Sequence, residues 1–479
     1  MSLDPRPRLV GLALGTTAIY FIWLAIVAHP PLGYIFLTLE AALYLLLILF
    51  VYNDSSPRYE VLGGRYSMRG LVDVLIPTKN EAEQLLEPTL RAAAAIAYAS
   101  KRLYVLDDGD RPWVKALAKR YGATYLVRPN RRTHPGKANN LNFGLSQSFG
   151  SFILVLDADQ IARPEILDDM LGHFRDPKVA LVTSRQEFRV SEDDFNNDYL
   201  FYGYMQAGKS ASYSPISTGS GVIYRRSALS AIHGFQTWNL LEDLYTSFVL
   251  NQHGYRSLYV NQAYTSGEAP RDLAVIYKQR GTWAHDTLRF WIWRQPLFAR
   301  GLRFRQRLQY FEMGYIYFVS AVIIPGIYAL SFYSLFTNIP ILVVGWWYLL
   351  FRLPSFYTTL HMYDELGRNS ASSRMWAALY PVFLWSLLKA LLYVKPRIGH
   401  VTKKARQVTT HPALVVPQLL TIAVGVYAFY YHYTHFGITL LFSINAFWFV
   451  VMIYWMWPVF PRAFGKLKRP ATHAQPQAA

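Results

Sequence analysis

The chain has 479 residues and a formal net charge of +18, from 48 Lys and Arg against 30 Asp and Glu. Apolar residues make up 52% of it and charged residues only 16%, whereas soluble domains carry about a quarter charged residues. Disorder over most of the chain is therefore excluded, and an ordinary soluble enzyme is not expected. The sequence contains no cysteine, which excludes disulfides, thiol nucleophiles and Cys-ligated metal centres.

Apolar stretches near both ends of the chain predict membrane-spanning helices, each of which needs about 20 residues. Two lie in the segment 1–53, at residues 9–28 and 32–52, and four lie in the segment 301–465, at residues 313–336, 339–363, 413–431 and 438–457. A further stretch at 375–394 contains Pro381 and Lys389 and has basic flanks. We expect it to form a helix that lies in the membrane interface rather than a seventh span.

The Lys and Arg residues are distributed unevenly between the two ends of these predicted spans. The connections at 29–33, 337–338 and 432–437 contain none, whereas the opposite connections are basic. The positive-inside rule then predicts a multi-pass protein of the plasma (inner) membrane with both termini and the long insert in the cytoplasm. Residues 466–479 are expected to be a disordered tail. The lipid bilayer thus accounts for much of the charge, and no nucleic-acid partner is expected.

Residues 70–300 form the long water-soluble region. Short apolar runs at 72–77, 102–106, 124–127 and 152–156 alternate with helical patterns at 81–97, 112–121 and 138–148. This alternation predicts an α/β domain with a mainly parallel sheet. Such sheets bind ligands beyond the carboxyl ends of their strands, where Asp107-Asp108-Gly109 and Asp157-Ala158-Asp159 both fall.

Two acidic motifs each have a functional and a structural interpretation. Asp157 and Asp159 could hold a divalent cation together with substrate phosphates, or they could be a solvated turn. Glu242 and Asp243 could supply a general base, or they could cap the helix that follows. From the residues alone, the two readings of Glu242 and Asp243 are about even.

The segment from Gln279 to Arg294 is rich in Arg and Trp. Such a stripe usually belongs to a membrane interface or a core patch, but it could also bind a diphosphate and stack on a sugar ring. A phosphate-binding loop of the Gly-x-x-x-x-Gly-Lys-Ser/Thr type does not occur.

The order of the motifs is more informative than any one of them. The chain contains, in sequence, Pro77-Thr78-Lys79-Asn80-Glu81, Asp107-Asp108-Gly109, Gly136-Lys137-Ala138-Asn139-Asn140, Asp157-Ala158-Asp159, Gly219-Ser220-Gly221, Glu242-Asp243 and Gln279-Arg280-Gly281-Thr282-Trp283. This order resembles the processive family 2 inverting glycosyltransferases, with bacterial cellulose synthase catalytic subunits the most similar and hyaluronan, chitin-oligosaccharide and curdlan synthases as further relatives. The resemblance implies a cytosolic GT-A domain at 70–300, inserted between transmembrane segments.

The resemblance also implies a role for each motif residue. The residues that would bind the nucleotide are Thr78, Glu81, Asp107, Asp108, Lys137, Asp157, Gln279 and Arg280, and those that would hold Mg²⁺ or Mn²⁺ are Asp157 and Asp159. Asp243 would be the catalytic base, with Glu242 beside it, and the acceptor would be bound by Trp283, Gly219 and Ser220. A gating loop within 395–406 would contain His400, Val401 and Thr402.

This sequence departs from the family pattern at three of these motifs. Leu241 stands where the family has a Thr, which keeps the acid pair Glu242-Asp243. Thr282 stands where the family has an Arg, which removes a bidentate phosphate contact that Arg280 could replace. His400 stands where the gating loop of the family has a Phe.

The predicted function is a membrane-integrated processive β-glycosyltransferase that elongates a polysaccharide, by default a β-glucan from UDP-glucose, and moves it across the membrane. The predicted partners are a UDP-sugar donor and a nascent polysaccharide acceptor. The alternative is a non-processive enzyme that adds one sugar to a lipid acceptor. The sugar, the linkage and any accessory subunits stay open at this point.

Overall fold

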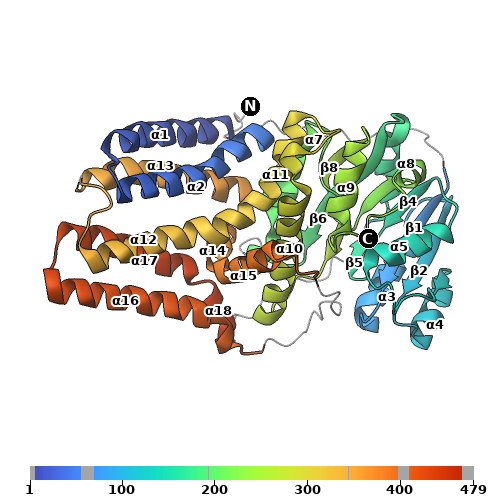
Figure 1. Ribbon diagram of the computed structural model, residues 1–479. Coiled ribbons are helices and arrows are strands. Elements are labelled where there is room, and N and C mark those ends of the chain that lie inside the picture. The colour runs from blue at the N-terminus through green and yellow to red at the C-terminus, as the bar shows by residue number, and fades with distance from the viewer. Residues whose placement is uncertain (1–5, 56–69, 192–193, 344, 397–408, 466–479) are drawn as a thin grey trace.

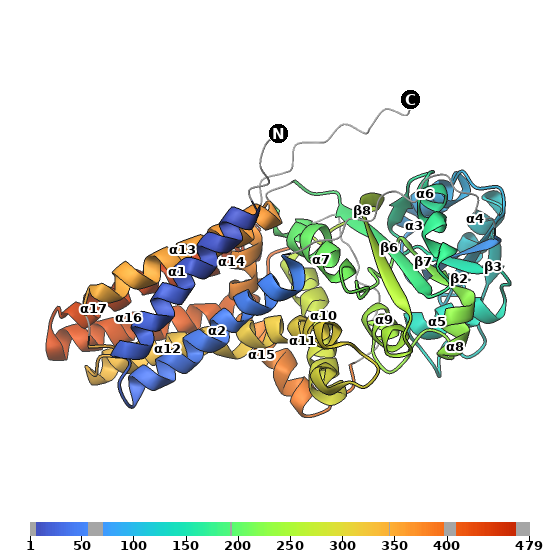
Figure 2. The same ribbon diagram turned by 90° about the horizontal axis from the view of Figure 1, so that it is seen from above.

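The computed structural model describes residues 6–55, 70–191, 194–343, 345–396 and 409–465. Two regions lie side by side, a bundle of long helices on the left and an α/β region on the right (Figures 1 and 2). Helices α10, α11 and α15 lie between them in both views. The predicted gating-loop residues His400, Val401 and Thr402 and the predicted tail at 466–479 lie outside the described residues.

The α/β region is built on one eight-stranded sheet with the order β3-β2-β1-β4-β7-β6-β8-β5. Its strands are β1 (Val72–Thr78), β2 (Lys101–Asp107), β3 (Thr124–Leu126), β4 (Phe152–Val155), β5 (Gln160–Ala162), β6 (Val179–Phe188), β7 (Val222–Arg225) and β8 (Arg256–Gly267). The first four strands are parallel neighbours, β7 is antiparallel to both of its neighbours, and β5 is antiparallel to β8. The predicted α/β class with a mainly parallel sheet is confirmed.

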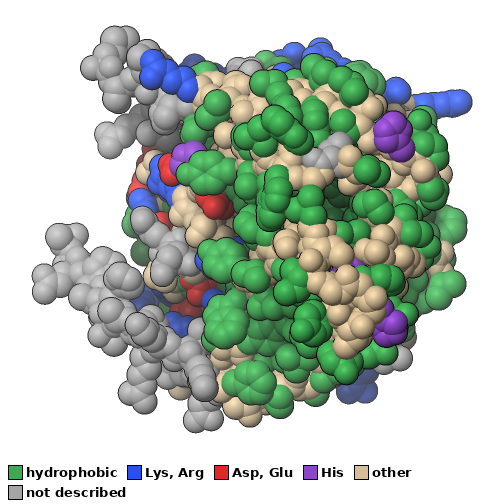
Figure 3. Space-filling view, turned by 90° about the vertical axis from the view of Figure 1, so that its left-hand side faces the viewer, with side chains coloured by type: hydrophobic (Ala, Val, Ile, Leu, Met, Phe, Trp, Pro, Cys, Tyr) green, Lys and Arg blue, Asp and Glu red, His purple; other side chains and the backbone are tan. Residues whose placement is uncertain are grey.

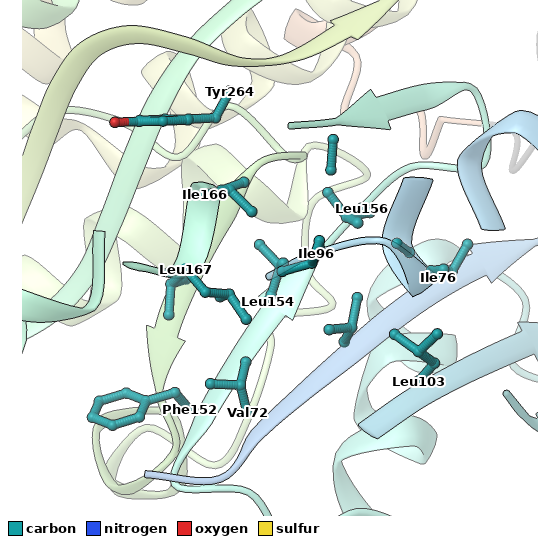
Figure 4. Close-up of a cluster of buried hydrophobic side chains, with 14 of the residues drawn as sticks. Val72, Ile76, Ile96, Leu103, Phe152, Leu154, Leu156, Ile166, Leu167 and Tyr264 are labelled. Carbon is teal, nitrogen blue, oxygen red and sulfur yellow. The ribbon is translucent and has the colours of Figure 1, made fainter. Parts of the chain in front are cut away.

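Both faces of the sheet are buried. All seven residues of β1 are buried, as expected for a strand covered on both sides. Because alternate side chains of a strand point to opposite faces, Val72, Val74 and Ile76 join one apolar core and Leu75 joins another. Figure 4 shows the first core, in which Val72, Ile76 and Leu154 come from neighbouring strands.

Short helices cover the two faces. The first core is closed by α3 (Glu83–Ala94), α4 (Pro112–Arg120) and α6 (Ile166–Met170), and the second by α5 (Lys137–Ser146), α8 (Arg226–Ala231) and α9 (Glu242–Gln252). Both α5 and α9 begin at the edge of the sheet where β1 and β4 end, so their first residues face the same space.

The bundle contains a helix at each predicted span. These are α1 (Arg6–Val27), α2 (Leu32–Asp54), α11 (Phe304–Phe318) continued through the π-helical turn η5 (Val319–Ile323) into α12 (Ile324–Thr337), α13 (Trp347–Gly367), α16 (Val416–Phe436) and α17 (Leu440–Met456). Apolar side chains such as Ile22, Ile26 and Val450 point outward from it, and they dominate the end of the bundle in Figure 3.

Fewer of these helices than predicted could cross a membrane on their own length and composition. Within the described ranges, four do so, at residues 7–27, 32–54, 304–337 and 412–436. Helix α17 has only 17 residues, and α13 carries Arg352, Pro354, Asp364 and Glu365. For α13 and α17, the prediction of a membrane span therefore depends on their position in the bundle, because their own length or composition does not support it.

The segment predicted to lie in the interface forms two short helices, α14 (Ser370–Ala378) and α15 (Tyr380–Leu391). Twelve residues of α15 are too few to span a bilayer. One side of α15 buries Tyr380 and Phe383, while Trp385 on the other side is 63% exposed. Its inner face packs on α10 (Leu273–Arg294), so it joins the two regions of the molecule.

Candidate active site

A cavity of about 780 Å³ opens at the carboxyl ends of β1 and β4. Its walls come from the loops after these strands, the segment 216–219, the first turns of α5 and α9, one face of α10, and parts of several bundle helices. Most of the predicted site residues line it: Thr78, Glu81, Asp108, Lys137, Asp157, Asp159, Gly219, Glu242, Asp243, Gln279, Arg280 and Trp283.

Lys137 stands at the centre of the charged residues in this cavity. Its Nζ lies 2.7 Å from Asp157 Oδ1 and 2.9 Å from Glu242 Oε1, and it donates a hydrogen bond to the Gly219 carbonyl at 2.9 Å. Burial alone would lower the pKa of Lys137, but the carboxylates of Asp157 and Glu242 outweigh it and raise that pKa. Three segments far apart in the sequence therefore meet at one ammonium group.

Asp243 lies beside this cluster, in the first turn of α9. Its Oδ1 accepts the Leu244 N–H at 2.7 Å, and Ser247 Oγ donates to its carbonyl at 2.7 Å. Removal from solvent in the cleft, reinforced by the neighbouring charge of Glu242, raises the pKa of Asp243 to about 7. A carboxylate with that pKa is suited to accept a proton near neutral pH.

Gly219 is pressed against Asp243. A Cβ at this position would lie 2.8 Å from Asp243 Oδ2, and the backbone has a φ of +77°. Both the space and the backbone conformation therefore require glycine. Ser220, the next residue, is wholly buried, and its Oγ accepts the Asp157 N–H at 2.9 Å instead of facing the cavity.

Asp157 and Asp159 suit a divalent cation. Burial and the neighbouring charge of Asp159 raise the pKa of Asp157, although Lys137 opposes them. A cation between the two carboxylates would relieve this repulsion. Within the described residues, no group of three or more acidic or His side chains is arranged to hold a metal by itself. Mg²⁺ is commonly bound by one or two carboxylates together with substrate phosphates. Asp157 and Asp159 therefore fit the predicted ion.

Three of the predicted nucleotide-binding residues, Thr78, Glu81 and Asp107, form one hydrogen-bonded group through Arg111. Glu81 Oε2 accepts from Thr78 Oγ1 and from the Lys79 N–H, both at 2.7 Å. Arg111, which the sequence interpretation missed, donates to Thr78 Oγ1 at 2.7 Å and pairs with Asp107 at 2.9 Å. The Asp107 side chain is fully buried and lies outside the cavity lining, so it supports the wall through Arg111. Its predicted contact with the nucleotide stays a prediction.

A second Arg that the sequence interpretation missed lies behind Asp108. The Nε and Nη2 atoms of Arg128 donate to the Asp108 carboxylate at 2.7 and 2.6 Å. The same fully buried guanidinium donates to the carbonyls of His134 and Gly136. Arg128 thereby fixes the loop that leads directly into Lys137.

Helix α10 supplies the wall nearest the bundle through Gln279, Arg280 and Trp283. Arg280 Nη2 lies 2.6 Å from Asp198 Oδ2, and its guanidinium carbon lies 4.9 Å from the centre of the Trp283 ring. Asp198 also lines the cavity and was not predicted. Thr282 Oγ1 donates to the Lys278 carbonyl of its own helix at 2.8 Å, so this position supplies no charge to the cavity.

Comparison with known proteins shows what this region of the chain is similar to. Residues 69–285 match the family described as "Glycosyltransferase like family 2". The matched residues include all eight strands of the sheet and helix α10 as far as His285.

Among curated proteins, the chain is 29% identical over 354 residues to "Cellulose synthase 1" of Komagataeibacter xylinus, covering 70% of this chain and 22% of that protein. It is 33% identical over 252 residues to "Cellulose synthase catalytic subunit [UDP-forming]" of Pseudomonas fluorescens (strain SBW25), covering 50% of this chain and 34% of that protein. The chain is 26% identical over 420 residues to a second Komagataeibacter xylinus protein, "Cellulose synthase 1 catalytic subunit [UDP-forming]", covering 80% of this chain and 55% of that protein. The chain thus spans less than two thirds of the length of these relatives.

Among solved structures, the "Mannosyltransferase PcManGT from Pyrobaculum calidifontis in complex with GDP-Man and Mn2+" superposes with a TM-score of 0.54 at 18% identity. The match covers 81% of this chain and all of that one. It shows that the fold is GT-A-like.

Proposed function

We propose that the protein transfers a sugar, most simply glucose, from a UDP-sugar to the end of a growing β-glucan and passes the product into the membrane bundle. The curated relatives named as UDP-forming cellulose synthases support the donor and the polymer. The observation that carries the proposal is the shape of the cavity, which continues from Asp157 and Asp243 to Arg352, Tyr363 and Trp455 inside the bundle.

The residues of the cavity are suited to an inverting displacement. An acceptor hydroxyl oxygen attacks the anomeric carbon, the bond from that carbon to the diphosphate oxygen breaks, and UDP leaves with the bonding electrons. Asp243 takes the hydroxyl proton, while Lys137 and Arg280 offer positive charge to the phosphates. Asp157 and Asp159 would hold Mg²⁺ or Mn²⁺, which supplies further positive charge to the leaving group. Attack from the opposite side converts an α-linked donor into a β-linked product.

The acceptor would lie between this cluster and the bundle. Trp283 is the flat side chain nearest to Arg280 and offers a stacking surface for a sugar ring. Beyond it the cavity is lined by Tyr317, Trp376 and Tyr363. Such a row of aromatic and hydroxyl groups suits a carbohydrate chain better than it suits a single small acceptor.

A second cavity of about 420 Å³ extends this path. It shares Leu43, Ile324, Arg352, Phe356 and Trp455 with the first and reaches Pro340 and Leu440 at the other end of the bundle. That end carries the connections without Lys or Arg, which we assign to the side away from the cytoplasm. The two cavities together support a route for the product across the bilayer.

One observation favours the alternative of a lipid acceptor. Most side chains around the second cavity are apolar, including Phe332, Phe429 and Phe449, and such walls would also accept a lipid tail. The length of the product distinguishes the two functions: a polysaccharide acceptor would give a long chain, whereas a lipid acceptor would receive one sugar.

The test uses the full-length protein in lipid nanodiscs with radiolabelled UDP-glucose and Mg²⁺. We expect UDP release together with a long product that a β-glucanase degrades, and neither product with Asp243→Asn. A labelled lipid carrying one sugar would establish the alternative instead. A panel of UDP-sugars in the same assay identifies the donor, and absence of UDP release from every member would refute the proposal.

A further inference from the structure

The wall helix α10 has a second contact with the catalytic region, one turn beyond Trp283 and outside the cavity lining. Asp286 lies one turn after Trp283 and is fully buried, and it is absent from the cavity lining. Its partners belong to the loop 236–241, which leads into α9 and so to Glu242 and Asp243. The proposed reaction leaves this buried carboxylate without a role.

The contacts of Asp286 fix both the backbone and a side chain of that loop. Asp286 Oδ2 accepts the N–H of Leu240 and, at 3.3 Å, that of Leu241. The Asp286 carbonyl accepts Asn239 Nδ2 at 3.0 Å. Leu241 is the residue immediately before α9, so these bonds set where the helix begins.

A basic and aromatic cluster holds Asp286 in turn. Arg289 Nη1 donates to Asp286 Oδ1 at 3.3 Å and to the Trp238 carbonyl at 3.1 Å. The guanidinium carbons of Arg289 and Arg294 each lie 4.2 Å from the centre of the Trp238 ring. The loop is thus bound to α10 at both its beginning and its end.

Two functional surfaces are therefore connected through one residue. Trp283 on α10 provides the surface proposed for the acceptor, and Asp243 on α9 is the proposed base. We propose that Asp286 is a positioning residue that holds Asp243 at a fixed distance from the acceptor surface. This inference rests on the proposed function, since it assumes that Asp243 acts on the acceptor hydroxyl.

Positioning matters because proton transfer and attack need near-contact geometry. A displacement of about 1 Å in a catalytic group can lower a rate by about 100-fold. Without an acceptor at Asp286, the Leu240 N–H loses its buried partner, whereas the Leu241 N–H keeps Asn239 Oδ1 at 2.8 Å. The loop then loses its side-chain attachment to α10 at Leu240, and the first turn of α9 is free to shift. Donor binding should change little, because most of the proposed nucleotide contacts, those of Thr78, Glu81 and Lys137, lie outside the loop 236–241.

The experiment compares Asp286→Leu, Asp286→Asn and Asp73→Asn in nanodiscs. Asp73 is the matched control: it is equally buried, and its Oδ2 likewise accepts a backbone N–H, from Gly150, and an Arg, from Arg226, but it lies at the start of β1, away from the cavity. Steady-state rates with UDP-glucose, the KM for the donor and hydrogen–deuterium exchange of residues 236–244 are measured for each.

We expect Asp286→Leu to lower kcat by about 30- to 100-fold with the donor KM within about twofold. Asp286→Asn retains an oxygen that can accept the Leu240 N–H, so it should recover most of the rate. Exchange at Leu240 should rise in Asp286→Leu, with a smaller rise at Leu241, which keeps Asn239 Oδ1 as acceptor. Asp73→Asn should lower the unfolding temperature and leave kcat and this exchange unchanged.

The exchange measurement separates this inference from the proposed function. If UDP-glucose is not turned over by the wild-type protein but exchange at 240–241 rises only in Asp286→Leu, the positioning contact stands and the assigned reaction fails. Unchanged exchange, or a loss of kcat no greater than that of Asp73→Asn, would overturn the inference.

Discussion

Two groups of charged side chains lie along the same pair of cavities, and they differ in how far solvent reaches them. In the first, Lys137 is 27% exposed and Asp157 is 35% exposed. In the second, inside the bundle, Arg352 is 5% exposed and its partner Glu40 is 1% exposed. The partly exposed side chains of the first group, the open group, are accessible to a substrate or a metal ion. The buried side chains of the second, the closed group, contact other residues of the bundle.

The closed pair is held from several directions. Arg352 lies 3.1 Å from Glu40, donates to Tyr44, and has its guanidinium 5.3 Å from the Tyr20 ring and 5.2 Å from the Phe356 ring. Charges inside a membrane bundle are expensive and are expected to face the interior and to pair, as these do. If the proposed function holds, charged side chains along these cavities serve chemistry at one end, and at the other they stabilise the bundle.

The largest expected effect is on the open group. Asp243→Asn should reduce polymer formation by about 10²- to 10⁴-fold, because the amide cannot accept the hydroxyl proton. UDP affinity, measured by calorimetry, should change little. The control is Asp176→Asn, which removes only a partly exposed ion pair with Arg256 and should leave the rate unchanged. Polymer formation at the wild-type rate in Asp243→Asn would exclude Asp243 as the base.

The next effect is on the closed group and concerns stability. Glu40→Leu leaves the Arg352 charge buried without its partner, which should lower the free energy of unfolding by about 3–5 kcal/mol. Thermal unfolding in detergent measures it. Adding Arg352→Met to Glu40→Leu should restore much of the loss, and Glu87→Gln, which breaks an exposed pair with Arg120, should have little effect. If Glu40→Leu and Glu87→Gln lowered the free energy of unfolding equally, the buried pair would contribute no more to stability than an exposed pair, and the prediction would be wrong.

A smaller effect is expected at the proposed metal site. Asp157→Ala and Asp159→Ala should each lower UDP affinity in the presence of Mg²⁺ by about 10- to 100-fold, a range typical for disturbed metal sites, and should abolish the difference made by adding the ion. The exposed acid Asp168 offers a control, because Asp168→Ala removes a similar charge far from the cavity lining. UDP affinity that stays Mg²⁺-dependent in both variants would place the metal elsewhere.

The mildest test is pH. Because the base must be ionised and the pKa of Asp243 in the protein without substrate is about 7, kcat/KM should rise from pH 6 to pH 8 with its midpoint near 7. The sign for stability is opposite. A carboxyl whose pKa is raised in the folded state favours folding below its unfolded pKa, and that contribution is lost as pH rises through about 7. A kcat/KM that stays constant across this range would contradict the assignment.

Sequence patterns predicted the parts of the molecule that depend on local order. The apolar runs that became β1, β2 and β4 were visible because buried parallel strands are continuously apolar, and the acidic turns at their ends followed from the same reading. Lys137 came only from the family resemblance.

The residues that were missed depend on distant partners. Arg128 meets Asp108 across 20 residues, Asp198 meets Arg280 across 82, and Asp286 meets Leu240 across 46. Nothing near these residues in the chain distinguishes them from ordinary surface charges. Span counting was limited for a related reason, since α13 interrupts its apolar residues with Arg352, Asp364 and Glu365 and lies in the bundle through its packing against α1.

The uninterrupted run from Phe304 to Thr337 determines how far the chemistry stands from the bilayer. Its 34 residues would measure about 50 Å as a helix, against a hydrocarbon thickness of about 30 Å. If its apolar end crosses the membrane, the remainder acts as a rigid spacer of about 20 Å whose length no loop movement can alter. Each added sugar would then enter the lipid-embedded passage at a constant height, so advance of the polymer must come from motion of the chain itself or of side chains, not from the catalytic domain approaching the membrane.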